Sequence, residues 1–72
     1  MYKGGEFTGP DLARVAQPRP PFGPGFTPEE IAGAVRLEVW HTSFADPGGD
    51  YTEFRLFAAN GDKVGERKVE GY

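Results

Sequence analysis

The residues best suited to hold a metal ion lie close together between His41 and Glu53. One histidine and three carboxylates occur within these thirteen positions, and both groups are common ligands of divalent cations. The acidic spacing of a calcium-binding loop is absent, and zinc sites usually hold more histidine or cysteine ligands. The competing interpretation is that Asp46 and Asp50 stabilise turns while Glu53 pairs with Lys68. A loop-centred ligand or metal site at His41, Asp46 and Asp50 is therefore the alternative hypothesis, and no metal is predicted.

Nucleophilic catalysis is the second chemistry that this stretch suggests. Ser43 follows His41 by two positions and Asp46 comes next, so the residue types of a hydrolytic triad are present. A triad also needs a rigid pocket and an oxyanion hole, for which a short helix and one sheet leave little room. Glycine-rich phosphate loops and the H-E-x-x-H zinc motif do not occur. We predict neither enzymatic activity nor a bound cofactor.

The segment 51–72, which carries Glu53, is predicted to form a β-hairpin. Asn60-Gly61 separates two alternating runs and is typical of a two-residue type I′ turn, in which both residues have positive φ. That turn places opposite charges across from each other on one face, and a shift of one residue would lose both pairs. The predicted cross-strand pairs are Glu53 with Lys68, Arg55 with Glu66, Thr52 with Val69 and Phe57 with Val64.

A further strand is predicted at residues 34–42, where apolar and polar residues alternate in AVRLEVWHT. Pairing Val39 with Phe54 and Leu37 with Leu56 puts the apolar side chains of both strands on one face. The eight residues 43–50, SFADPGGD, then form the connecting loop, because Asp-Pro-Gly-Gly is typical of a turn. The pattern predicts a three-stranded antiparallel β-meander.

Residues 1–26 are predicted to form an N-terminal arm with a proline-rich connector. A short helix is expected from about Thr8 to Gln17, where the chain reaches the first of several prolines. The connector, residues 17–25, contains four prolines and two glycines and can be neither helix nor central strand. It is expected to be extended and stiff.

A second short helix is predicted to begin at Thr27. Thr27 as N-cap, Pro28 at the first helical position and Glu30 at the third form a capping box. Residues 27–72 then comprise this helix and the three-stranded sheet. The fold class is predicted to be α+β, with the arm as a separate N-terminal segment.

The predicted registers leave aromatic residues on the sheet face opposite the core. Either the arm covers this face with Phe7, Phe22 or Phe26, or the face binds another protein, since tryptophan and tyrosine are frequent interface anchors. The edges of the sheet also allow a second copy of the chain to pair by strand addition. The partner surface is predicted to comprise Trp40, Tyr51, Phe57, Val64 and Phe22.

Composition restricts the function further. The chain has 72 residues, no cysteine and a formal charge of −3, which argues against binding to nucleic-acid phosphates. No apolar run is long enough to span a membrane, so we expect a soluble, cytoplasmic protein that binds neither nucleic acid nor membrane. The expected function is that of a small non-catalytic interaction protein, an accessory subunit or an inhibitor, which acts by burying a surface of another protein chain or of a second copy.

Overall fold

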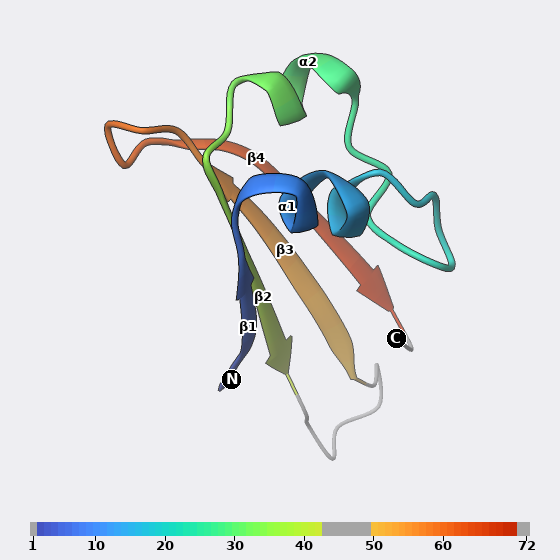
Figure 1. Ribbon diagram of the computed structural model, residues 1–72. Helices are drawn as coiled ribbons and strands as arrows, with labels where there is room; N and C mark the ends of the chain where they lie inside the picture. Colours follow the sequence, from blue (N-terminus) through green and yellow to red (C-terminus); the bar gives the residue numbers. More distant parts are fainter. Residues whose placement is uncertain (1, 43–49, 71–72) are drawn as a thin grey trace.

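The computed structural model describes residues 2–42 and 50–70, and within them one antiparallel sheet carries two short helices on one face (Figure 1). The strands lie in the order β1-β2-β3-β4. The α+β class is thus confirmed, but the predicted number of three strands is wrong, because the described chain has four. The elements are β1 (Tyr2–Phe7), α1 (Gly9–Ala16), α2 (Pro28–Ala32), β2 (Arg36–Thr42), β3 (Tyr51–Phe57) and β4 (Lys63–Glu70).

The unpredicted strand is β1, which pairs with β2 and places Phe7 opposite Leu37. The sequence does not predict this strand, because Gly4 and Gly5 interrupt the alternation of apolar and polar residues and glycine is unfavourable in strands. The register of β1 is irregular at this glycine pair. A Cβ atom on Gly4 would lie 2.3 Å from Cδ2 of His41, so a larger residue here would force the imidazole to move.

The register of β2 with β3 is confirmed in full. Leu37 lies opposite Leu56 and Val39 opposite Phe54, and Glu38 is the neighbour of Arg55 on the other face. The predicted loop between these strands lies outside the described residues, except for Asp50, which is exposed.

The turn between β3 and β4 differs from the predicted type I′ turn. The backbone N–H of Ala58 donates to the Asp62 carbonyl at 2.8 Å, so three residues form the loop. Of these only Gly61 has positive φ, +92°, and Asn60 accepts a hydrogen bond from the Asp62 N–H through its side chain. A shift in the ladder at Leu56/Phe57 then restores the predicted pairs further along. Three-residue loops are commonly followed by such a bulge.

This bulge makes one predicted pair wrong. Phe57 lies opposite Lys63 and not opposite Val64. The pairs of Glu53 with Lys68 and Arg55 with Glu66 are confirmed.

The helices begin where the sequence predicts. In α2 the Thr27 hydroxyl accepts from the Glu30 N–H at 3.2 Å, and the Glu30 carboxylate accepts from the Thr27 N–H at 3.0 Å. This completes the predicted capping box. Helix α1 covers the middle of the sheet with Leu12 and Ala16, both buried.

The hydrophobic core lies between the helices and the sheet. Phe7 and Phe26 of the arm lie on this side of the sheet and do not cover the opposite face, because Phe26 is buried in the core and Phe7 packs against it. The core residues are Leu12, Ala16, Phe26, Leu37, Val39, Phe54, Leu56 and Val69.

Candidate functional site

The sheet face opposite the helices, which we call the outer face, carries three of the predicted partner-binding residues. Trp40, Tyr51 and Phe57 alternate with core residues along β2 and β3, and all three are half-buried. A cationic side chain lies over each ring, at a distance that allows a cation–π interaction. The pairs are Arg55 over Trp40 at 5.0 Å, Lys68 over Tyr51 at 5.2 Å and Arg36 over Phe57 at 4.6 Å.

Two carboxylates connect these cations across the outer face. Glu53 is only 4% exposed and forms ion pairs with Arg55 and, at 4.0 Å, with Lys68. Glu38 accepts a hydrogen bond from Nε1 of Trp40 at 3.0 Å and lies 3.1 Å from Nε of Arg36. The outer face is therefore a layer in which aromatic and charged side chains contact one another.

Val64, the fourth predicted residue of that face, is exposed at the β4 bulge. The bulge separates it from its predicted cross-strand neighbour Phe57. Val64 therefore does not extend the aromatic row in the way that the predicted register implied.

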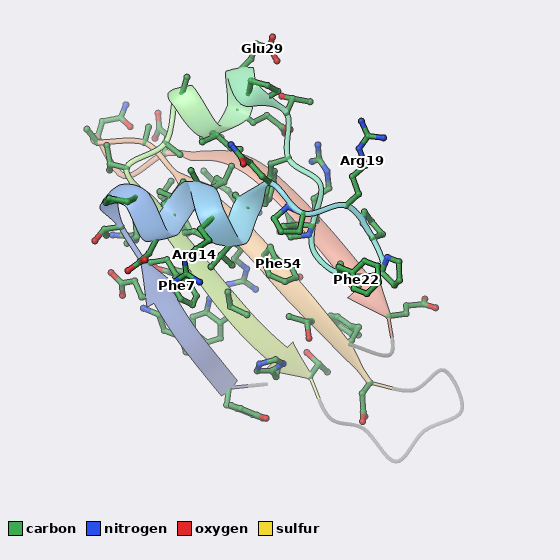
Figure 2. The ribbon with its side chains drawn as sticks, turned by 45° about the vertical axis from the view of Figure 1, so that its right-hand side comes forward. Phe7, Arg14, Arg19, Phe22, Glu29 and Phe54 are labelled. Carbon is green, nitrogen blue, oxygen red and sulfur yellow. The ribbon has the colours of Figure 1, made fainter. Side chains whose placement is uncertain are left out.

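Phe22, the fifth predicted partner-binding residue, is the most exposed large apolar side chain of the described chain, at 79%. It lies in the connector between α1 and α2, and in Figure 2 its ring lies at the opposite end of this connector from the side chain of Arg19. On either side the chain is anchored, because Ala16, Gly23, Pro24 and Phe26 are buried. We refer to residues 18–25 as the Phe22 loop.

Backbone hydrogen bonds hold the Phe22 loop in one conformation. The N–H groups of Phe22 and Gly23 both donate to the Arg19 carbonyl, at 2.9 and 3.1 Å. The N–H of Gly25 donates to the Pro18 carbonyl at 2.7 Å, and that of Phe26 to the Ala16 carbonyl at 3.0 Å. The loop is thus a closed, internally bonded unit that displays an apolar ring, and the predicted extended conformation of the connector is wrong because the chain turns back on itself here.

Two glycines are required for this closure. A Cβ atom on Gly23 would lie 2.6 Å from the carbonyl oxygen of Pro18, which is backbone and cannot rotate away. Gly25 has a φ of +67°, a conformation that side chains disfavour. The peptide bond between Pro20 and Pro21 is cis.

The candidate metal ligands do not come together in the described part of the chain. Nδ1 of His41 lies 3.0 Å from the Thr52 hydroxyl, and its ring stacks obliquely on Tyr2 at 5.4 Å between centroids. Asp50 is exposed at the start of β3, and Asp46 and Ser43 lie outside the described residues. No group of three or more histidine, cysteine or acidic side chains with metal-binding geometry occurs among residues 2–42 and 50–70.

A cavity that the sequence did not predict lies beside α1, on the helix-bearing face of the sheet. Its volume is about 360 Å³. Helix α1 has eight residues and is therefore about 12 Å long, too short to cover all four strands. The lining residues are Gly4, Phe7, Arg14, Val15, Val39, His41 and Phe54.

An ion pair joins α2 to the sheet. Nη2 of Arg67 donates to Glu30 at 2.7 Å, and the guanidinium lies 4.9 Å from the centre of the Phe26 ring. The hydrogen bond from the Thr27 N–H, together with the charge of Arg67, holds the pKa of Glu30 below its usual value. Arg67 can therefore lie on the helix-bearing face of the sheet, because Glu30 balances its charge and the Phe26 ring packs against its guanidinium.

No protein-family model, curated protein sequence or solved structure matches this chain. None of the helices in the described residues is long and apolar enough to cross a membrane.

Proposed function

We propose that this chain is a small non-catalytic interaction protein, an accessory subunit or an inhibitor, that binds another protein through the Phe22 loop. The observation that carries the proposal is an exposed phenylalanine, 79% accessible, on a loop closed by its own backbone hydrogen bonds. Binding would insert the ring of Phe22 into an apolar pocket of the partner. The mechanism is occlusion or scaffolding by surface burial, with no chemical step.

The energetics favour such an anchor. Burying a phenylalanine side chain that is otherwise exposed contributes roughly 1.5–3 kcal/mol. A loop that is already ordered loses less conformational entropy on binding than a flexible one, so more of that energy appears as affinity. The side chain of Phe22 is 79% accessible, so most of its apolar surface can still be buried by a partner.

The surroundings of Phe22 indicate the chemistry of the partner surface. Pro20 and Pro21 are exposed beside it, and Arg19, three positions earlier, adds a positive charge to the same loop. A complementary partner has an apolar pocket for Phe22 and, further along its surface, a carboxylate for Arg19. A second copy of this chain fits less well, because the one cavity described above has Arg14 in its lining, and Arg14 would repel Arg19.

The outer face is the second candidate surface. Its rings of Trp40, Tyr51 and Phe57 remain partly accessible under their cationic neighbours, and aromatic residues and arginine are enriched at interface hot spots. Binding there requires a partner that preserves or replaces the ion pairs of a buried glutamate. That cost makes Phe22 the favoured anchor.

The test compares matched truncations of exposed apolar residues. A partner is isolated with the wild-type chain from its native host and purified, and its affinity is measured by isothermal titration calorimetry against Phe22→Ala and Val35→Ala. Val35 is also an exposed apolar residue but lies before β2, outside the Phe22 loop. Phe22→Ala should weaken binding at least about thirtyfold, which corresponds to roughly 2 kcal/mol, and Val35→Ala should bind like wild type.

A second pair of variants tests whether binding depends on the conformation of the Phe22 loop as well as on the apolar area of Phe22. Gly23→Ala keeps Phe22 but forces Pro18 to move, so it should weaken binding while the chain stays folded by circular dichroism. Gly33→Ala, whose added methyl group meets only ordinary contacts, is the control. Unchanged affinity in folded Phe22→Ala, or a loss confined to Trp40→Ala, would refute the loop as anchor and favour the outer face.

A further inference from the structure

The cavity beside α1 is separate from the Phe22 loop. It is bounded by β1, α1, β2 and β3, and none of its lining residues belongs to residues 18–25. Its volume of about 360 Å³ falls within the range of roughly 300–1,000 Å³ that is usual for ligand pockets. In Figure 2 Phe7 and Arg14 lie near each other where α1 passes over β1.

Most of the cavity wall is apolar. Val39 and Phe54 belong to the core and form part of the lining from the sheet, and Phe7 and Val15 contribute half-buried apolar surface from β1 and α1. A hydrocarbon group that enters would displace water chiefly from Phe7 and Val15, because Val39 and Phe54 are buried, and this burial is favourable at roughly 25 cal/mol per Å². The wall therefore selects for a ligand with an apolar body.

Two polar side chains in the lining can recognise a charged group. His41 is oriented by the contact of its Nδ1 with Thr52, and Gly4 makes room for the side of the ring that carries Nε2. Arg14 provides a guanidinium with several N–H donors suited to a carboxylate. Its ion pair with Asp11, at 3.0 Å, joins two largely exposed side chains, and such pairs are weak enough to exchange partners.

The charge of the lining selects the sign of the ligand. Arg14 carries a full positive charge and His41 offers a ring nitrogen, whereas none of the lining residues is acidic. The nearest opposing charge in contact with the lining cation is that of Asp11. We infer that this cavity binds a small monocarboxylate with an apolar tail, the tail against Phe7 and Val15 over the floor of core residues and the carboxylate toward Arg14 and His41.

The experiment is an NMR titration of the ¹⁵N-labelled full chain with octanoate, 1-octanol and octylamine, each kept below its aggregation concentration. These probes share a tail length and differ in the charge of the head group. Octanoate should shift the backbone amides around the cavity, including those of Gly4, Val15 and Val39, with an affinity at least about fivefold above that of 1-octanol, the factor of a favourable exposed ion pair. Octylamine should bind least.

Variants test separately the charged part of the cavity, Arg14, and its apolar wall. Arg14→Gln should reduce octanoate affinity about fivefold and leave 1-octanol binding unchanged, whereas the matched variant Arg19→Gln, on the Phe22 loop, should have no effect. Asp11→Asn should tighten octanoate binding, because it removes the competing carboxylate. Val15→Phe should abolish binding of all three probes by filling the cavity.

Several results would overturn the inference. Equal affinity for octanoate and 1-octanol, octanoate shifts that survive Arg14→Gln unchanged, or no shifts with any probe would each show that the cavity is not a carboxylate site. Shifts of the same amides with protein concentration alone would show that a second copy of the chain occupies it.

Discussion

Replacing Glu53 by glutamine removes the central charge of the outer face without changing side-chain volume. Glu53 is 4% exposed and its carboxylate contacts Arg55 and Lys68. Breaking a fully buried ion pair costs about 3–5 kcal/mol, because the remaining charge loses its partner. Here the side chains of Arg55 and Lys68 are 25% and 56% exposed, so water compensates them in part. We therefore expect Glu53→Gln to lower the free energy of unfolding by roughly 2 kcal/mol.

The assay is urea unfolding, followed by the fluorescence of Trp40, the single tryptophan, and by circular dichroism. In a chain of this size the same change corresponds to a fall in melting temperature of roughly 8–16 °C. The matched control is Glu66→Gln on β4, where the exposed carboxylate pairs with Lys63 at 2.8 Å. This control should unfold like wild type. A Glu53→Gln midpoint equal to that of Glu66→Gln would refute the account of the outer face as a mutually dependent charge layer.

Further predictions concern the elements that hold the fold. Thr27→Ala should destabilise the chain by about 1 kcal/mol in urea unfolding, because it removes the N-cap of α2. The pKa of Glu30 is lower in the folded chain than in the unfolded chain, where it is about 4.3. The stability that this carboxylate contributes is therefore fully present above the unfolded pKa and is lost as the pH falls through the lower folded pKa. Unfolding measured at a series of acidic pH values should show this loss in wild type and less of it in Glu30→Gln. Leu37→Ala should cost about 2–5 kcal/mol in the same assay, since Leu37 is fully buried. Gly61→Ala should lower the melting temperature, because its φ is +92°, and an unchanged value would contradict the assigned turn.

The registers around β3 were predictable because two independent patterns agree there. Apolar alternation and opposite charges give the same pairing of β3 with β2 and β4. The error at the turn arose because an Asn-Gly pair fits more than one loop. Only the backbone shows a three-residue loop whose extra residue is compensated by a bulge, which leaves Val64 exposed and away from Phe57.

The N-terminal strand was not predictable from local pattern. Gly4 and Gly5 give β1 neither side-chain alternation nor strand propensity, and the strand is stabilised by its pairing with β2. The space that Gly4 leaves for His41 is likewise visible only once both strands are placed.

In the candidate sites, too, some features were predictable from the sequence and others depend on tertiary structure. Phe22 was named from the sequence as a partner-binding residue, which stays a prediction, whereas its exposure and the hydrogen bonds that fix its loop depend on tertiary structure. The cavity could not be predicted at all, because it results from how a short helix lies across a wider sheet. The predicted registers place cationic and aromatic residues side by side on the outer face. That a cation lies directly over each ring was not predicted.

The central claim is that the ring of Phe22 enters the partner. The most direct measurement is site-specific photo-crosslinking in the native host, with benzoylphenylalanine placed at position 22 or at position 57 of the outer face. The account predicts a specific cross-linked product from position 22 and little from position 57. Cross-linking from position 57 alone would place the interface on the outer face and contradict the proposed role of the Phe22 loop.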